Sequence, residues 1–577
     1  MDVEELRKIE ETEAGYRALR WLPYLLFLIV TAILAIPLLK NFSYWGIRDW
    51  DLFTTLHAAA VHTVKEYGQF PFWNPWIGGG NILFAHPETP VLHPSFLLLW
   101  LLGPLAGLKI QILLIYYLGF IGMFKLARIL EINFWAALVP PLVYMLSSYF
   151  ALHFAEGHIP FHYFAFLPWL VFFYKKSLNN SWHILSIGGV TAFMILGSGA
   201  AVPMLFSLFF LFLISLFDIN RKKIIRGPAF AVAGGVCGIL FSAVKFFPMY
   251  DYLSRYPWSP EGTIMTTPLW ILPKMFFAFH QSLFSDYIRG YTWGWHEYGA
   301  FIGPIAALLI LAALAIRFKR NWPYLALIII SIILLAGSFA SWSPWDLLHK
   351  LPGFESVRVP SRLSLLAIFA AAILAGKGLD SVMELFQHGK VAIAGVIFAA
   401  ILGTHLFVCL PILNHIFRRP PLQVVYNKDF KQTYGEPNHL YETFLANRGS
   451  IKAAWLSAYR PGRAILDYND NVLEWYSEDN KVQVLDRDFT PNRIKYYLQS
   501  GGGGVLTVSV GYDSGWKRTD GGEILDRGEL LSFVIPAGKT ELEIYYFPDY
   551  FTLGLFISLL SIMGAILAPF LYRTLRK

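Results

Sequence analysis

Two carboxylates stand close together in the stretch "WGIRDWDLF", where Asp49 and Asp51 follow a long apolar run. A carboxylate acts as a general base when it lies within hydrogen-bond reach of the proton that it removes. The run "DLFTTLHAAAVHTVKEYGQ" has apolar residues at helical spacing, so we expect an interfacial helix with both acids at its start. The helix dipole favours negative charge there, so a helix cap with a solvated acid is the alternative to catalysis.

Polar and aromatic residues are mixed in the next stretch, "FPFWNPWIGGGNILFAHPETPVLHP". Its three successive glycines allow a backbone to approach a ligand closely. Trp73, Asn74, His86 and Glu88 are therefore candidates for a pocket wall. Tryptophans at a membrane surface also form interfacial belts, which is the structural alternative for this stretch.

The turn "HFAEGHIPFH" has three histidines and one glutamate within ten residues. This density resembles a metal-ligand cluster, but the spacing is not that of an HExxH zinc site. The same residues would equally suit a polar mouth that closes over a binding site. Glu156 and His158 are the candidates from this turn for contact with a substrate.

Basic residues in two later loops could meet phosphate. The first loop contains "KFFPMYDYLSRYPW" and "SDYIRGYTWGWHEYGAFIG", and the second contains "LPGFESVRVPSRLS". Guanidinium groups match phosphate oxygens bidentately, whereas arginines at a membrane boundary also serve as anchors. The candidates for binding substrate or phosphate are Arg255, Arg289, His296, Glu297, Arg358 and Arg362.

These residues belong to a chain that is mostly apolar. Of its 577 residues, 56% are hydrophobic and 15% are charged, whereas a soluble domain has roughly 25% charged residues. The composition predicts a polytopic α-helical membrane protein. The net charge of +8 then reflects basic cytoplasmic loops and not nucleic-acid binding. The two cysteines provide neither a disulfide framework nor a metal site.

About 12 apolar runs have the roughly 17–25 residues that approach or cross a ~30 Å hydrocarbon layer. If 91–107 is a helix at the outer surface and not a span, the basic turns "RKKIIR" at 221–226 and "RFKR" at 317–320 share one side with both termini. Basic loops face the cytoplasm, so both termini are expected inside and the carboxylate pair outside. The predicted spans are 21–39, 109–128, 134–152, 161–176, 181–197, 200–218, 228–247, 299–317, 323–340, 361–376, 391–413 and 551–572.

The domain organisation follows from this topology. A soluble region before the last span has strand-like runs such as "VLTVSVGYDSGW" and "ELEIYYFP", separated by glycine turns, which predicts a small β-sandwich. The run "GGGG" at 501–504 is a loop, because neither a helix nor GK[ST] follows it. We expect a cytoplasmic tail at 1–20, a membrane domain at 21–413 with juxtamembrane helices in outer loops 40–108 and 248–298, an extracytoplasmic mostly-β domain at 414–549, and a final span with a basic tail at 550–577.

The chain resembles the YfhO-like bacterial membrane proteins of the GT-C superfamily of integral membrane glycosyltransferases. The likeness rests on "RDWDLF…QFPFWNPWIGGG", "EGHIPF", "LPGFESVRVPSR" and "GYDSGWKRTDGGE…VIPAGKTELEIYYFPDYFTLGLFIS", which extend from residue 48 to 560. It implies a GT-C core with its active site on the outer face, a sugar donor on polyprenyl phosphate, and an acidic first-loop residue as base.

The resemblance also implies roles for particular residues. Asp49 and Asp51 match the acidic motif, with Asp49 as the expected base and Asp51 orienting it or ligating a divalent cation such as Mg or Mn. Glu156 and His158 match the GH turn of the family. Arg358 and Arg362 match the "R.P.R" segment and are expected to contact the donor phosphate.

The leading hypothesis is a transferase that moves one sugar from a polyprenyl-phosphate carrier, with inversion, to an extracytoplasmic cell-envelope polymer, lipid-linked glycan or protein. Its partners would be membrane lipid, the donor, the acceptor, and a polyprenyl-phosphate glycosyltransferase and flippase that supply the donor. A ligase or polymerase of whole glycans is a second enzymatic hypothesis. A transporter, flippase or polysaccharide-binding scaffold is the non-catalytic alternative, although the chain has no clear internal repeat of the kind that transporters often show.

Overall fold

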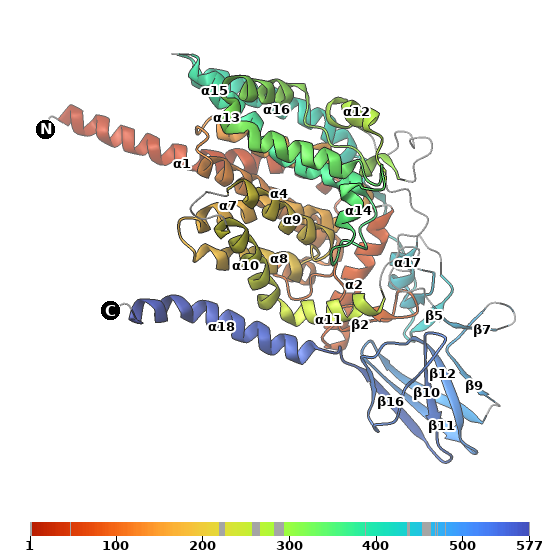
Figure 1. The fold of residues 1–577 in the computed structure, drawn as a ribbon. Coiled ribbons are helices and arrows are strands. Elements are labelled where there is room, and N and C mark those ends of the chain that lie inside the picture. Colours follow the sequence, from red (N-terminus) through yellow and green to blue (C-terminus); the bar gives the residue numbers. More distant parts are fainter. Residues whose placement is uncertain are drawn as a thin grey trace.

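The structure is a computed structural model in which a bundle of helices carries a β-rich domain (Figure 1). Both chain ends lie on the side of the bundle that faces away from the β-rich domain. The structure describes residues 3–575 except for 47, 219–224, 257–265, 282–292, 387, 436–438, 453–462, 468, 470 and 479–480.

Within the described residues, seven helical stretches are long and apolar enough to cross a membrane, or eight if the bent pair α10 and α11 forms one span. The helices α8 and α9 are also apolar but shorter, and the count of about 12 spans stays a prediction. The bundle contains α1 (Val3–Leu39), α4 (Pro104–Ile129), α5 (Val139–Met145), α6 (Ser148–Glu156), α7 (Leu167–Ser177), α8 (His183–Leu196), α9 (Val202–Phe217), α10 (Arg226–Phe241), α13 (Pro304–Leu335), α15 (Ser364–Glu384), α16 (Lys390–Leu413) and α18 (Phe551–Leu575).

The helix α13 folds back on itself. At Arg317 the backbone leaves the helical region, with φ −136° and ψ 49°. The N–H of Gly303 before the helix bonds to the carbonyl of Phe276 (3.2 Å), and the carbonyl of Ala336 after it accepts the N–H of Thr267 (3.1 Å). A straight helix of 32 residues would be ~48 Å long, so its two ends could not both reach the short segment 267–276. The two arms therefore meet at Arg317, in the predicted "RFKR" turn.

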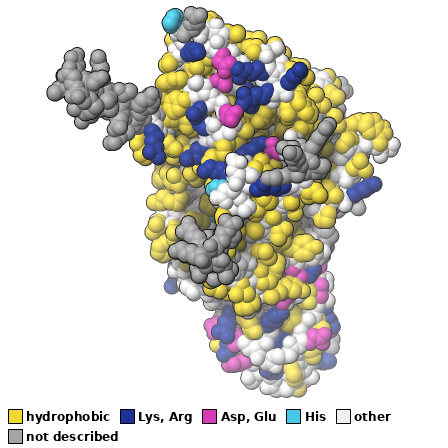
Figure 2. All heavy atoms as spheres, turned by 60° about the vertical axis from the view of Figure 1, so that its left-hand side comes forward, with side chains coloured by type: hydrophobic (Ala, Val, Ile, Leu, Met, Phe, Trp, Pro, Cys, Tyr) yellow, Lys and Arg dark blue, Asp and Glu magenta, His cyan; other side chains and the backbone are white. Residues whose placement is uncertain are grey.

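Basic side chains gather on the side of the bundle that carries the chain ends. Figure 2, which brings this side forward, shows them together with a few acidic side chains on a largely apolar surface. Arg317 pairs there with Glu384, and Arg320 pairs with Glu131. The "RFKR" turn thus lies with the two termini, as the charge pattern requires. Residues 221–224 of the other basic turn lie outside the described residues.

Short helices and turns cover the opposite side of the bundle. The seven-residue α3 is only ~10 Å long and cannot cross a membrane. The helix α2 begins at Asp49, as the sequence predicts, but it is buried over most of its length and does not lie on an exposed interface. These elements are α2 (Asp49–Tyr67), α3 (Phe96–Leu102), η2 (Ile159–Phe166), α11 (Ala243–Arg255), η3 (Leu269–Ile271), α12 (Leu272–Phe277), η4 (Trp295–Glu297), α14 (Pro344–Leu348) and η5 (Pro360–Leu363).

The β-rich domain has two four-stranded antiparallel sheets, with strand orders β10-β11-β16-β13 and β14-β15-β12-β9. Alternate residues such as Ile494, Leu506 and Phe533 are buried in one shared core, which is the pattern of a sandwich. The strands are β9 (Trp475–Ser477), β10 (Val482–Thr490), β11 (Arg493–Ser500), β12 (Gly504–Gly511), β13 (Trp516–Arg518), β14 (Leu525–Arg527), β15 (Leu530–Ile535) and β16 (Glu541–Tyr546).

Residues 417–452 join the bundle to the sandwich. The strand β4 pairs with β1 of the first outer loop, and α17 packs against α2. This packing covers α2, which explains its burial. The joining elements are β1 (Trp45–Gly46), β2 (Trp73–Asn74), β3 (Asn81–Ile82), β4 (Phe417–Arg419), β5 (Lys431–Thr433), α17 (Leu440–Leu445) and β6 (Arg448–Ser450), and a further pair is β7 (Ile465–Leu466) with β8 (Val472–Leu473).

Candidate functional site

The candidate site is built on the C-terminal end of α6. The N–H of Gly157 bonds to the carbonyl of Phe154 (3.1 Å), and the N–H of His158 bonds to the carbonyl of His153 (2.9 Å). Together with the φ of 102° at Gly157, these bonds form a Schellman ending, in which glycine takes the left-handed position without strain. The chain reversal brings the rings of His153 and His158 together, with their Nδ1 atoms 2.8 Å apart.

This turn packs directly against the first outer loop. Nε2 of His158 lies 3.2 Å from Oδ2 of Asp49. Burial alone would lower the pKa of His158, but its hydrogen bond to Asp49 and the charges of Asp49 and Glu297 raise the pKa above its ordinary value. A Cβ atom on Gly157 would lie 2.3 Å from the backbone nitrogen of Trp50, so glycine is also needed for this close approach. The conformation and packing of Gly157 thus place Asp49 beside an imidazole.

Two ion pairs flank the contact between Asp49 and His158. Arg48 pairs with Glu156, and Arg362 binds Glu297 with Nε 2.8 Å from Oε2. Glu297 is fully buried, and the paired guanidinium overcomes the effect of burial and holds the pKa of Glu297 well below its ordinary value. Glu297 is therefore a buried carboxylate that stays ionised.

His296 and Glu88 complete the cluster. Nδ1 of His296 lies 3.4 Å from Oε2 of Glu156, and its Nε2 lies 3.7 Å from Oε1 of Glu297. Burial lowers the pKa of His296 to about 3, so this imidazole is neutral. Burial raises the pKa of Glu88 to about 7, while the charges of His158 and Asp49 act on it in opposite directions. Of the four residues predicted as a pocket wall, Glu88 is the one whose charge interacts with Asp49.

Asp51 faces away from this cluster. Its Oδ2 accepts the N–H of Leu440 (2.8 Å), and its Oδ1 accepts the N–H of Tyr441 (3.0 Å). Asp51 is 3% exposed, and burial raises its pKa although both backbone bonds oppose this. We expected Asp51 to orient the base or to ligate a cation, but its two oxygens are engaged at the start of α17. The physical reason is that the chain turn at residues 48–51 sends the two carboxylates to different neighbours.

Trp73 and Asn74 lie in the joint between the first outer loop and the sandwich. The ring of Trp73 packs against Trp516 (5.3 Å between centroids) and Tyr546 (4.7 Å) in the sandwich core. The carbonyl of Gly79 accepts the N–H of Gly511 (2.8 Å). The aromatic and glycine-rich stretch therefore approaches the sandwich closely.

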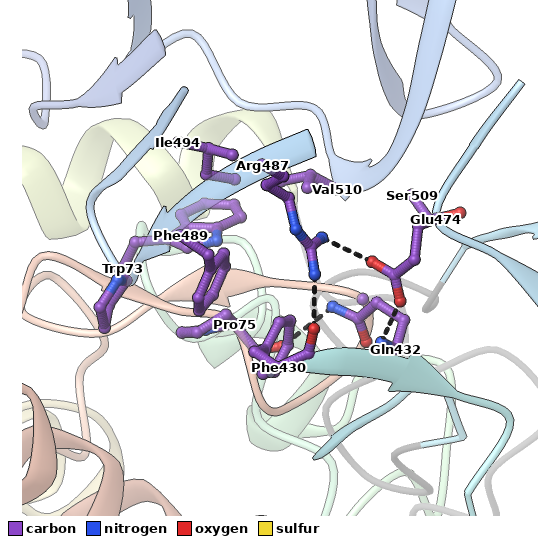
Figure 3. A pocket seen from close by; sticks show the side chains of 12 residues that line it. Trp73, Pro75, Phe430, Gln432, Glu474, Arg487, Phe489, Ile494, Ser509 and Val510 are labelled. Carbon is purple, nitrogen blue, oxygen red and sulfur yellow. Dashed lines mark hydrogen bonds and ion pairs between the residues drawn. The ribbon is translucent and has the colours of Figure 1, made fainter. Parts of the chain in front are cut away.

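A small pocket of about 280 Å³, including its open mouth, lies in this joint beside Trp73 (Figure 3). Nη1 of Arg487 bonds to Oε2 of Glu474 (2.7 Å), and the backbone N–H of Gln432 donates to Oε1 of Glu474 (2.6 Å). Both oxygens of this carboxylate are thus bonded to the chain. The pocket is part of the joint between the first outer loop and the sandwich. The residues that line it are not those of the histidine cluster.

The remaining predicted residues lie in different places. His86 is buried, and its Nδ1 accepts the N–H of Glu88 (3.2 Å). Arg255 binds Asp251 (2.8 Å) and Asp513 (2.9 Å), so it links α11 to the sandwich and does not face the cluster. The Arg358 guanidinium lies 5.0 Å from the ring centroid of Trp293. Arg289 lies outside the described residues.

Two residues of the cluster were not among the predicted candidates. Arg48 stands next to the carboxylate pair, and His153 stands five residues before His158. The spacing "HFAEGH" could have revealed His153, since a helix that ends in glycine brings the residues at these two positions together. No local signal marks Arg48, because its partner Glu156 is distant in the sequence.

His158, His296 and Glu297 could hold a metal ion, because one ligand atom from each lies within 4.8 Å of the others. Nδ1 of His296 is buried and makes no hydrogen bond within the described part of the chain. Two imidazoles and one carboxylate suit zinc or manganese better than magnesium, which prefers oxygen ligands. The expected cation ligands were Asp49 and Asp51, whereas the geometry favours this other set, next to Asp49.

No family model matches the chain, and no curated protein matches its sequence. Among solved structures, the oligosaccharyltransferase of Archaeoglobus fulgidus, in complex with Zn and sulfate, aligns with 77% of this chain at 11% identity and a TM-score of 0.43. Arabinofuranosyltransferase AftD from Mycobacteria aligns with 66% of this chain at 16% identity and a TM-score of 0.36. The chain spans 64% and 27% of the lengths of these two proteins. At such TM-scores the function has to be argued from the site itself.

Proposed function

We propose that the protein is an integral membrane glycosyltransferase of the GT-C type, with Asp49 as the general base. The observation that carries this proposal is the contact between Asp49 and His158 within a largely buried cluster of acids, histidines and arginines. The Asp49 side chain is 19% exposed, so the carboxylate is held on one side and accessible on the other. An acceptor hydroxyl could therefore reach it within hydrogen-bond distance.

The proposed reaction transfers a sugar from polyprenyl phosphate to an acceptor hydroxyl. The acceptor oxygen forms a bond to the anomeric carbon, the bond from that carbon to the phosphate oxygen breaks, and the polyprenyl phosphate leaves with the electron pair. Asp49 receives the hydroxyl proton. The attack comes from the face opposite the leaving group, so the configuration of the sugar is inverted.

The leaving phosphate needs positive charge nearby. Arg362 binds Glu297, and we assign the contact with the donor phosphate mainly to Arg358. The Arg358 guanidinium lies beside Trp293, and Trp293 precedes His296 of the cluster by three residues. Arg362 would then act through Glu297, by keeping that acid ionised. A cation bound by His158, His296 and Glu297 would add Lewis-acid stabilisation of the phosphate.

The topology supports an extracytoplasmic reaction. The chain ends and the "RFKR" turn share one side of the bundle, and basic turns normally face the cytoplasm. The cluster includes the start of α2 and the end of α6. The joint with the sandwich packs against α2 through α17. We propose that the protein lies in the cytoplasmic membrane and acts on an external glycan, lipid or protein. A polyprenyl-phosphate glycosyltransferase and a flippase would supply the donor.

The test uses the full chain in lipid nanodiscs with a panel of synthetic polyprenyl-phosphate monosaccharides. Mass spectrometry measures the release of polyprenyl phosphate with and without glycan acceptors. We expect one donor to be turned over and Asp49→Asn to lower its turnover by at least about 10²-fold, the usual size of a general-base effect. Asp486→Asn, at an exposed acid of β10, is the matched control. Full activity of Asp49→Asn, or no turnover of any donor by the wild-type protein, would contradict the proposal.

A further inference from the structure

Arg48 has a backbone conformation that arginine rarely adopts. Its φ is 58° and its ψ is −128°, the values of the first central residue in a type II′ turn, where glycine is usual. The carbonyl of Arg48 accepts the N–H of Asp51 (3.0 Å), so Arg48 stands directly at the start of α2. A non-glycine residue in this region is strained and persists only when its surroundings hold it there.

The end of α6 supplies contacts that can hold this turn. The side chain of Arg48 forms its ion pair with Glu156, which is only 12% exposed. Two residues further along the chain, Nε1 of Trp50 donates to the carbonyl of Phe154 (2.8 Å). The first-loop residues 48–50 are thus bonded to residues 154–158 by three successive side chains, and the middle one is Asp49.

The strained turn decides where the carboxylates point. Because the backbone reverses at Arg48, Asp49 meets His158 of the α6 turn, while Asp51 meets the start of α17. A relaxed residue at position 48 would change the direction of the chain just before Asp49.

We propose that the ion pair between Arg48 and Glu156 is a positioning latch, which holds the strained turn and aims Asp49 at His158. This inference rests on the proposed function of Asp49 and gives Glu156 a positioning role in place of the substrate contact predicted from the sequence. Both partners act through Asp49 and touch neither donor nor acceptor. Their loss should therefore reduce kcat and leave KM for the donor nearly unchanged.

The test separates the ion pair from the strain. Arg48→Ala removes the ion pair and leaves a residue for which this turn is strained, so we expect a lower Tm and a kcat at least about tenfold lower, since small misplacements of a catalytic group are costly. Arg48→Gly also removes the ion pair, but glycine adopts this turn without strain, so Tm should return to the wild-type value or above and kcat should recover well above that of Arg48→Ala. The charge swap Arg48→Glu with Glu156→Arg should recover part of the kcat that each single change loses.

The same measurements of Tm and kcat provide the control and the outcomes that would contradict the proposal. Arg320→Ala breaks the exposed pair with Glu131 and should change neither Tm nor kcat. A kcat in Arg48→Gly as low as in Arg48→Ala, an unchanged kcat in Arg48→Ala, or a loss confined to KM would each overturn the latch. If Arg48→Ala fails to fold, Glu156→Gln decides by the same kcat criterion. An active Asp49→Asn would reject the proposed function, whereas an inactive Asp49→Asn with normal Arg48 variants would reject the latch alone.

Discussion

Asp49 and Asp51 are two residues apart, but they belong to two regions of different character. Asp51 accepts hydrogen bonds from two backbone amides, which have fixed positions and keep their protons. Asp49 contacts the imidazole of His158, a side chain whose protonation can change. The comparison teaches that burial of a carboxylate does not identify a site. The type of hydrogen-bond partner is what identifies it, because side-chain partners can rearrange around a substrate and backbone amides cannot.

The two buried arginine–glutamate pairs show the same difference. In the joint with the sandwich, both oxygens of Glu474 are bonded, to Arg487 and to the backbone of Gln432 (Figure 3). In the cluster, Glu297 also binds an arginine, and Nε2 of His296 lies 3.7 Å from its Oε1. The other ring nitrogen of His296, Nδ1, is buried and makes no hydrogen bond among the described residues. The Glu474 carboxylate is thus fully bonded, whereas the His296 imidazole of the cluster has bonding capacity left for a ligand; in the joint, Nε1 of Trp73 and Oε1 of Gln432 also lack partners among the described residues.

The largest loss of stability and activity is expected from a change at Gly157, where the end of α6 packs against the first outer loop. In Gly157→Ala, the new Cβ would occupy a left-handed residue and lie 2.3 Å from the nitrogen of Trp50. We expect the free energy of unfolding to fall by about 3 kcal/mol, and we expect transfer activity to be lost as well. Thermal melts in nanodiscs measure the first and donor turnover the second. Gly189→Ala, with open space around the new Cβ, should leave both unchanged, and equal effects at the two glycines would refute the packing argument.

Asp51→Asn should destabilise the protein more than it impairs the chemistry. The amide group cannot accept both backbone N–H groups, so one buried donor loses its partner, at a cost of about 2 kcal/mol. The expected result is a lower Tm with kcat per folded molecule within about threefold of wild type, in contrast to Asp49→Asn. A kcat loss as large as that of Asp49→Asn, without a change in Tm, would place Asp51 in the chemistry.

The partly buried acid Glu88 should make stability depend on pH. Its pKa is raised to about 7 in the folded protein, so folding favours its protonated form. The protein then loses stability as pH rises from about 4.5 to about 7, by an amount on the order of 2 kcal/mol. Glu88→Gln should abolish this part of the pH dependence, seen as a Tm difference from wild type that grows over that range. A constant difference between the two proteins would show that Glu88 is ionised throughout.

The smallest effect is expected from Arg255→Ala in the joint. This change leaves the buried Asp513 without its guanidinium partner, although Asp513 still accepts bonds from Gly515 and Tyr546. We expect a loss of about 1 kcal/mol and unchanged turnover per folded molecule. Arg463→Ala, which breaks an exposed pair with Glu529, should lower stability by less. A selective loss of turnover in Arg255→Ala would show that the joint communicates with the cluster.

Local patterns predicted much of the fold. The start of α2 at Asp49, the folding back of α13 in "RFKR" and the alternating strands of the sandwich all follow from spacing over a few residues. The burial of α2 could not be predicted in this way, because α17, which covers it, lies almost 400 residues later in the chain.

The candidate site was predictable only as a set of residue types. The sequence by itself determined that acids, histidines and arginines lie near the ends of apolar helices, because hydropathy and charge govern where a chain leaves the membrane. Only the tertiary structure decided that Asp49, His158, Glu297 and Arg362 share one cluster, while Asp51 fastens α17 and Arg255 fastens the sandwich. The reason is that these contacts join segments at least 65 residues apart, and their partners are chosen by packing and by backbone direction at single turns such as Arg48, on which no short-range pattern acts.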